Sequence, residues 1–364
     1  GGHAAGDQTR GRIYRVAPPA SKYTNPKEDY STASGAIAAL QNPNLAVRYN
    51  AFTALQNMGA AAIPALEKYW ATAQDPRMCA RAFWALVKMP GANASQYIQQ
   101  AIKLTNADMR ITAIRAATEL NANIIGVVGA LIHDTDAGVR RECALALRHN
   151  KSAESAELWA TLATQHDGKD RWYLEALGIG ADRQWDKFFA AYLTKINNPL
   201  LTAASKDIVW RARTELAVPF IASLAADTLQ SLQNRLRYFR AFDFNAGPAK
   251  SKLLLKMIAD NTSNDIALNK LVLHALDIKT VTQSPVAQKA LATVLQSVNG
   301  TGEYIELVSR YEVKSQNENL LQFLFSSRRC VVAAPYSQET RSISRTHVRR
   351  WWPRQISVRL AFAD

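Results

Sequence analysis

A short apolar pattern recurs along this chain at an almost constant interval, and it constrains the fold more than any other feature. The segment "VRYNAFTAL" at residues 47–55 has the pattern R-x-x-A-x-x-A-L, and "VRRECALAL" at residues 139–147 repeats it with cysteine at the first alanine position. Together with three weaker copies, these segments place five arginines 29, 33, 30 and 31 residues apart, at Arg48, Arg77, Arg110, Arg140 and Arg171. Three later segments, at Ala204, Arg235 and Asn269, keep the apolar spacing, so we expect about eight units.

The spacing within each copy predicts an amphipathic helix. Small or apolar residues at positions i+3, i+6 and i+7 fall on one stripe of a helix, and that stripe needs a neighbouring element to cover it. A second helix is indicated by prolines that lie 13 to 16 residues after four of the markers and precede apolar runs, at Pro64, Pro219, Pro248 and Pro285. Because proline is favoured in the first turn of a helix, each unit is predicted to be helix, turn, helix.

Asparagine or aspartate lies a few positions before most of the markers. These side chains accept hydrogen bonds from the free N–H groups of a helix start, so we predict that they are N-caps. The predicted caps are Asn44, Asp75, Asp108, Asp136, Asp170, Asn234 and Asp265.

Two helices per unit, a period near 31 residues and a first helix of the form D-x-x-V-R-x-x-A-x-x-A-L resemble HEAT repeats, and short bacterial HEAT-like units in particular. Tetratricopeptide units need a strict 34-residue step, and ankyrin units need T-P-L-H; neither is present. The predicted fold is therefore all-α. It is a right-handed α-solenoid of about eight HEAT-like helical hairpins over residues 33–324, in which each unit packs on its neighbours.

The two ends of the chain do not follow the repeat. Residues 1–32 contain "RGRIYRV" at residues 10–16, which has the β-branched and aromatic composition of a strand, followed by a polar linker. Residues 325–364 form an irregular basic tail with eight arginines, no lysine and no helical or strand period. Such an abrupt change in composition is typical of an out-of-frame translation, and we assign this tail no function.

The junction between the first 32 residues and the array has a more specific resemblance. Gly2 and His3, the segment at residues 10–16 and "NPNLAVRYNA" at residues 42–51 resemble large membrane-bound dehydrogenase-like proteins of the Planctomycetes and Bacteroidetes type. In those proteins a β-propeller similar to glucose/sorbosone dehydrogenases is followed by HEAT repeats and often by a cytochrome c module. The resemblance implies that this chain is a fragment of an exported protein, periplasmic or at the cell surface. It also implies that residues 10–16 are a remnant of the propeller.

The formal net charge of +14 at pH 7 suggests an anionic partner, but its distribution weakens that interpretation. Eight arginines against Glu339 and Asp364 give residues 325–364 a charge of +6, which leaves +8 for the rest of the chain. The five marker arginines occupy the position where HEAT-like units pair arginine with an acidic or amide residue of an adjacent turn. We therefore predict that they form a structural ladder.

No sequence motif points to chemistry in this chain. G-x-S-x-G, Walker, H-E-x-x-H and G-x-G-x-x-G motifs are absent, and Cys79, Cys143 and Cys330 are too far apart for a C-x-x-C pair. The histidine and aspartate groups beginning at His133 and His166 recur one unit apart, which favours structural turns over metal ligands. We predict no catalytic, cofactor-binding or metal-binding residue here and no transmembrane segment, although the parent protein could be an oxidoreductase.

The expected function is that of a non-catalytic scaffold that binds a protein partner or the neighbouring domains of its parent. Trp172 and Trp185 are the candidate partner surface, because large aromatic residues anchor interfaces when the core does not need them. Two alternatives remain open. One is a basic nucleic-acid-binding protein similar to the HEAT-like alkylpurine DNA glycosylases, with converging cations, an exposed tryptophan and a carboxylate. The other is an adaptor that binds a peptide or protein in its concave groove.

Overall fold

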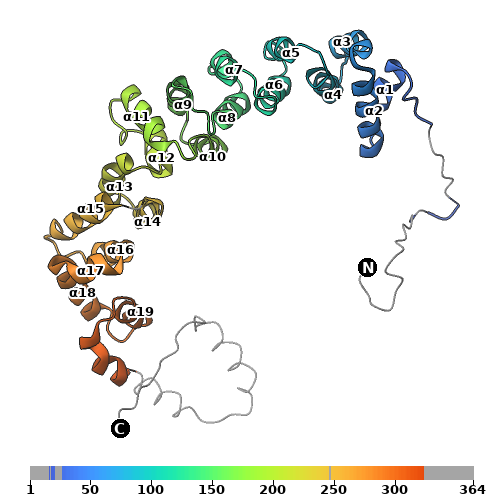
Figure 1. Ribbon diagram of the computed structural model, residues 1–364. Helices are drawn as coiled ribbons and strands as arrows, with labels where there is room; N and C mark the ends of the chain where they lie inside the picture. The colour runs from blue at the N-terminus through green and yellow to red at the C-terminus, as the bar shows by residue number, and fades with distance from the viewer. Residues whose placement is uncertain (1–15, 17, 21–26, 246, 324–364) are drawn as a thin grey trace. The chain divides into compact units, whose positions relative to one another are not determined.

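The computed structural model describes residues 16, 18–20, 27–245 and 247–323 (Figure 1). Within these residues there are 19 α-helices, four short 3₁₀ helices and no strand, which confirms the predicted all-α helical-repeat architecture. The first helix begins at Ala33. The strand predicted at residues 10–16, apart from Val16, and the tail at residues 325–364 lie outside the described residues.

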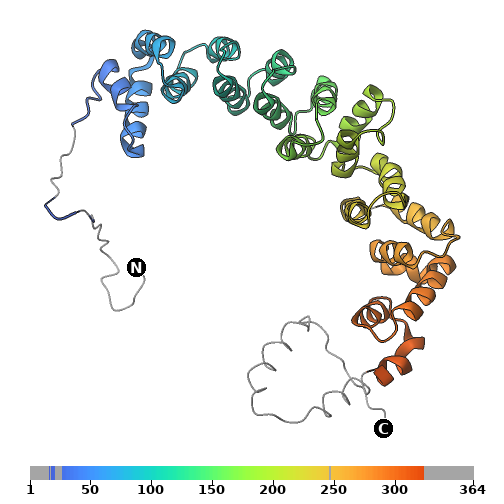
Figure 2. The same cartoon turned by 180° about the vertical axis from the view of Figure 1, so that it is seen from behind.

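The helices divide into two compact units, at residues 1–216 and 217–364. In the first unit, the first helices of successive hairpins pack side by side along α6, α8 and α10, and the second helices α9 and α11 pack together behind them (Figures 1 and 2). Its helices are α1 (Ala33–Ala39), α2 (Leu45–Met58), α3 (Ile63–Thr72), α4 (Pro76–Val87), α5 (Ala94–Ala101), α6 (Ala107–Glu119), α7 (Ile124–Leu131), α8 (Ala137–Ala146), α9 (Glu154–Thr164), α10 (Arg171–Gly180), α11 (Trp185–Lys195) and α12 (Ala203–Arg211).

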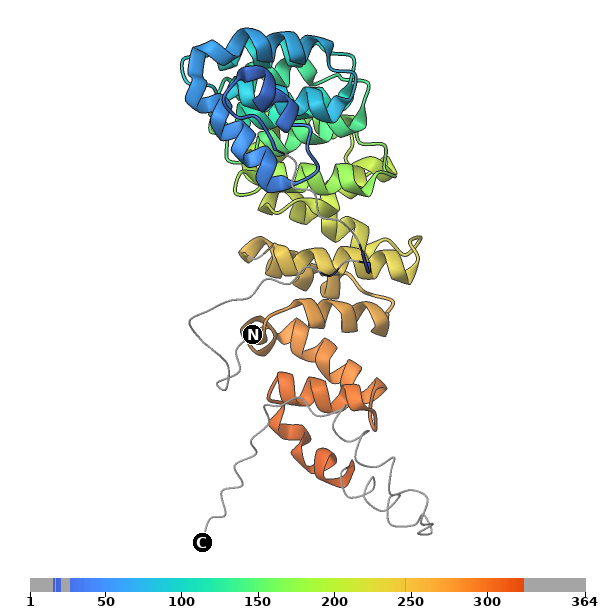
Figure 3. The ribbon, with the colours of Figure 1, turned by 90° about the vertical axis from the view of Figure 1, so that its right-hand side faces the viewer.

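In the second unit (Figure 3), second and first helices alternate from α13 to α16, and the short helix α17 precedes the second helix α18. In it, α14 packs on α13 and α16, α15 packs on α13 and α16, and α18 covers α15, α16 and α17. Its helices are α13 (Val218–Ala226), α14 (Leu232–Ala241), α15 (Pro248–Ala259), α16 (Ile266–Ala275), α17 (Ile278–Gln283), α18 (Pro285–Ser297) and α19 (Gly302–Arg310).

Local sequence signals account for most of the helix starts. The eight predicted markers lie in the first helices α2, α4, α6, α8, α10, α12, α14 and α16. The four predicted prolines occupy the first turns of α3, α13, α15 and α18. Five of the predicted N-caps accept hydrogen bonds at helix starts, namely Asn44, Asp75, Asp136, Asp170 and Asp265. The predictions for Asp108 and Asn234 are wrong, because Asn106 and Ser231 cap those helices instead.

A close approach of two first helices fixes the position of α10. A Cβ atom on Gly180 would lie 2.2 Å from the backbone oxygen of Ala144 in α8, so only glycine permits this separation. Behind α10, the fully buried Trp159 of α9 donates a hydrogen bond from Nε1 to the carbonyl oxygen of Leu177 at 3.0 Å. The backbone of α10 is therefore held from two sides.

Candidate functional site

The two sides of α10 have opposite environments. Asp170 caps the helix by accepting from the backbone N–H of Tyr173 at 3.0 Å, and Tyr173 and Leu177 face the core. On the other side Trp172 is 73% exposed and Ile179 is 42% exposed. Because these two residues are seven positions apart, they lie on the same face of the helix. Trp172 is the one tryptophan with an exposed side chain in the part of the chain that the structure describes.

Charged residues lie beside this apolar pair. Glu175, between Trp172 and Ile179, forms ion pairs of 3.3 Å with Arg171 in its own helix and with Arg211 of α12. We call these five residues the Trp172 face.

Arg211 reaches Glu175 by crossing the surface of α10 at Gly178. A Cβ atom added to Gly178 would lie 2.3 Å from Cζ of Arg211, so the guanidinium group rests on the bare backbone of the helix. The side chain of Arg211 is consequently only 19% exposed.

Trp185, the other tryptophan expected at a partner surface, is instead buried, with 6% of its surface exposed. Its ring packs edge-on against Trp159, with 5.5 Å between ring centroids, in the interface between α9 and α11. The sequence contains a signal for this position, because Trp185, Phe188, Phe189 and Tyr192 follow the i, i+3, i+4, i+7 spacing of a core stripe and all are buried.

Among the marker arginines, Arg110 forms the pair expected of a structural ladder. Its Nε and Nη2 donate to the carboxylate of Asp134, in the turn before α8, at 2.6 and 2.8 Å, and its Nη1 donates to the carbonyl oxygens of Leu104 and Thr105. The two side chains are 12% and 7% exposed. Burial alone would raise the pKa of Asp134, but hydrogen bonds from Arg110 and from the backbone N–H of Asp136 hold it below its ordinary value.

The other marker arginines have different surroundings. Arg140 donates to the carbonyl oxygens of Asp134 and Thr135 and lies 5.6 Å from the ring centroid of Tyr173. Arg48 is half-buried. Arg77 and Arg171 are largely exposed, and each pairs with an acidic residue two or four positions away.

Four other ion pairs of the first unit join neighbouring hairpins without using a marker arginine. Their partners are separated in sequence by about one repeat: 31, 27, 29 and 34 residues. These pairs are Lys88 with Glu119, Arg115 with Glu142, Arg141 with Asp170, and Arg148 with Asp182. A search for opposite charges one period apart would have found them.

The histidine and aspartate groups lie in structural turns. Asp134 binds Arg110, and Asp136 caps α8. His166 lies 3.2 Å from a carboxylate oxygen of Asp207 and stacks on Tyr173. Across the described ranges, no group of three or more His, Cys, Asp or Glu side chains is placed to hold a metal ion. No helix in those same ranges is long and apolar enough to cross a bilayer.

Comparison with known proteins identifies no family for this chain. No family model and no curated protein matches the sequence. One solved structure that matches, the crystal structure of an engineered protein, is 16% identical, and the alignment covers 79% of this chain and 78% of that chain. Its TM-score of 0.29 is too low to support an argument about fold or function.

Proposed function

We propose that this chain is a non-catalytic scaffold and that a protein partner docks on the Trp172 face. The observation that carries the proposal is the 73% exposure of Trp172 beside Ile179, on a helix whose other side is buried. Large aromatic side chains contribute most when a partner surrounds them and excludes water. An isolated helical repeat has no need of a tryptophan at such a position.

The rigidity of α10 supports the proposal. Gly180 and Trp159 hold the helix backbone from two sides, and Arg211 rests on Gly178 and pairs with Glu175. A partner would therefore meet a surface that needs little ordering on binding, which reduces the entropic cost of association.

The charge around Trp172 supports a partner with an acidic rim. Lys169, Arg171 and Arg211 are basic, Asp170 and Glu175 are acidic, and Asp170 is already paired with Arg141 of α8. Complementary charge of this kind mainly speeds association and selects among partners. We propose an apolar protein segment flanked by carboxylates.

The proposal extends to the parent protein. The support for an exported dehydrogenase-like parent is the sequence at residues 10–16 and 42–51, and the partner would then be another domain of that parent or a protein at the cell surface. In this proposal the HEAT-like array connects domains and any redox chemistry belongs to the parent.

Nucleic-acid binding is a second candidate, because Trp172 lies beside two arginines and a carboxylate. Exposed aromatic residues can stack on bases, and arginines bind phosphates. Against this, Arg211 is already paired with Glu175, and Arg115, Arg141 and Arg148 are paired between hairpins.

A capture experiment with matched variants tests the scaffold proposal. The full chain, Trp172→Ala and Tyr49→Ala are immobilised and exposed to an extract of the source organism. Tyr49 is the matched control because it follows Arg48 as Trp172 follows Arg171, and it is 68% exposed. A protein retained by the wild type and Tyr49→Ala, but lost with Trp172→Ala, supports the proposal. Equal retention by all three contradicts it.

Titration of a fluorescent DNA duplex tests the second candidate. The arginine-rich tail at residues 325–364 can bind DNA without using the site, so the sensitivity to Trp172→Ala decides the result. Salt-dependent binding that weakens with Trp172→Ala favours the nucleic-acid function over the scaffold. Binding that is unchanged by the substitution means that the duplex does not contact the Trp172 face, and this result favours the scaffold proposal over the nucleic-acid function.

A further inference from the structure

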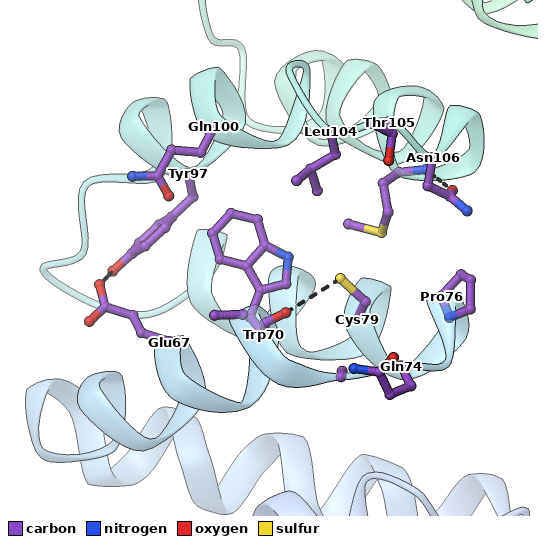
Figure 4. Close-up of a pocket in the computed structure, with 13 residues that line it drawn as sticks. Glu67, Trp70, Gln74, Pro76, Cys79, Tyr97, Gln100, Leu104, Thr105 and Asn106 are labelled. Atoms are coloured by element: carbon purple, nitrogen blue, oxygen red, sulfur yellow. Dashed lines mark hydrogen bonds between the residues drawn. The ribbon is translucent and has the colours of Figure 1, made fainter.

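A groove of about 690 Å³ lies in the first unit between α3 and α5, away from the Trp172 face (Figure 4). The indole ring of Trp70 projects from α3 into its middle, Cys79 of α4 lies on one side, and Gln100 and Leu104 line it from the opposite chain segment. The volume is within the range of about 300–1,000 Å³ that is typical of small-molecule sites.

The groove arises from an interruption in the packing of second helices. Farther along the unit, α9 and α11 pack directly against each other, but α3 and α5 form no comparable contact. They are joined at one end by a hydrogen bond of 2.8 Å from Tyr97 Oη to Glu67 Oε1. Burial, followed by this hydrogen bond, raises the pKa of Tyr97 to about 12. The tyrosine therefore remains a neutral donor at physiological pH.

The polar groups in the groove favour a particular kind of ligand. Trp70 packs against Phe83 and Tyr97, with ring centroids 5.8 and 6.0 Å apart, and this fixes the plane of the indole. Its Nε1–H is buried but has no acceptor among the described residues, and Figure 4 shows it on the side that faces Cys79. Buried indole N–H groups normally find an acceptor, so this unsatisfied donor favours a ligand that supplies one.

The lining of the groove disfavours anionic ligands. No lysine or arginine is among the described residues that line it, and its one carboxylate, Glu67, is bound to Tyr97. A buried charge without a partner is unfavourable. We propose that the groove binds a neutral, mainly apolar small molecule that presents a carbonyl oxygen to Nε1 of Trp70.

Cys79 provides a direct readout of binding. It is half-buried in the wall of the groove, whereas Cys143 is fully buried. The full chain carrying Cys330→Ser, which removes the third cysteine, is treated with a thiol-alkylating reagent at increasing concentrations of N-benzylacetamide. This neutral amide should slow alkylation of Cys79 in a saturable manner. Propylbenzene, which lacks the carbonyl, should protect less, and benzoate should not protect. Absence of saturable protection by the amide, or equal protection by benzoate, would overturn the proposal.

Two variants test the contacts. Trp70→Phe keeps an aromatic ring but removes the hydrogen-bond donor. It should weaken the binding of N-benzylacetamide by about 2- to 10-fold and leave the binding of propylbenzene unchanged. Leu104→Trp fills the groove from a partly exposed position without altering Trp70, and should abolish protection by the amide. The matched control is Leu201→Trp, at an exposed position outside the groove in the same unit. Protection that survives Leu104→Trp as well as Leu201→Trp would show that the amide binds elsewhere.

Discussion

Replacement of Asp134 by alanine removes the acidic partner of Arg110 in the interface between α6 and α8. The carboxylate accepts two hydrogen bonds from the guanidinium group, at 2.6 and 2.8 Å, and one from the backbone N–H of Asp136 at 2.9 Å. With side-chain exposures of 7% for Asp134 and 12% for Arg110, water screens this pair only weakly. The substitution leaves a buried guanidinium group without its counter-charge.

The expected loss in the free energy of unfolding is about 3 kcal/mol. Removing one partner of a buried ion pair typically costs about 3–5 kcal/mol. The lower end of that range applies here because Arg110 keeps hydrogen bonds to the carbonyl oxygens of Leu104 and Thr105. Glu119→Ala, in the same helix α6, is the matched control: its pair with Lys88 is 53% and 36% exposed, and such surface pairs contribute about 0–1 kcal/mol.

Urea denaturation followed by circular dichroism measures both losses. Hydrogen exchange should localise the effect, because a helical repeat is stabilised mainly by contacts between neighbours. We expect faster exchange in α6 and α8 than in α2. The account of Arg110 is refuted if Asp134→Ala costs no more than Glu119→Ala, or if exchange accelerates equally throughout the first unit.

The pH dependence of stability provides a related check. The pKa of Asp134 is lower in the folded protein than its ordinary value of 3.8, so its ionised form is favoured by folding. Its contribution is therefore complete above the ordinary pKa and is lost as the pH falls through the lower, folded-state pKa. Wild type should lose more stability than Asp134→Ala between about pH 5 and pH 2, and parallel pH profiles would contradict this assignment.

Three further substitutions or modifications have defined expectations. Gly180→Ala should lower stability by about 1–3 kcal/mol in thermal denaturation, because its Cβ atom would collide with the backbone of α8, whereas Gly129→Ala, with open space around its Cβ atom, should be neutral or stabilising by up to about 1 kcal/mol. Trp172→Ala should change stability by less than about 0.5 kcal/mol, since its side chain is largely exposed, and a larger loss would indicate a structural role. A thiol reagent at pH 8 should modify Cys79 in the native protein but not Cys143, which is fully buried and whose pKa is raised by burial to about 12. Mass spectrometry of the peptides identifies the modified residue, and modification of Cys143 before Cys79 would contradict the prediction.

The repeat pattern predicted the first helices well because it records packing between neighbouring units. Small or apolar residues recur at the positions of Cys143 and Leu147 because each first helix buries the same stripe against its neighbours. Prolines in the first turns of α3 and α18 are similarly local, since their fixed φ angle and missing N–H suit only the start of a helix.

The candidate site was only partly predictable. Trp172 and Trp185 both have aromatic neighbours in sequence, but Trp185 packs against Trp159 in the core while Trp172 faces outward. The side chain of Arg211 reaches Glu175 only because Gly178 leaves room for it, which depends on how α10 and α12 meet. Such contacts depend on the separation of helices rather than on the spacing of residues.

The groove beside Trp70 could not be predicted from the repeat. The pattern predicts a second helix in each hairpin, but it does not determine how closely consecutive second helices pack. The hydrogen bond between Tyr97 and Glu67 joins residues 30 positions apart, close to one repeat. A search for polar side chains that lie one repeat apart could have found this pair. The opening next to it depends on the side chains of two hairpins together.

Site-specific photo-crosslinking from the Trp172 face tests the central claim most directly. A benzophenone amino acid is placed at position 172, or at position 49 as the matched control, in the full chain, and the adducts formed in an extract of the source organism are identified by mass spectrometry. The account predicts a discrete protein adduct from position 172 that is absent from position 49 and is suppressed by Ile179→Glu, which alters the same face. Indistinguishable adducts from the two positions, or adducts with nucleic acid alone, would contradict it.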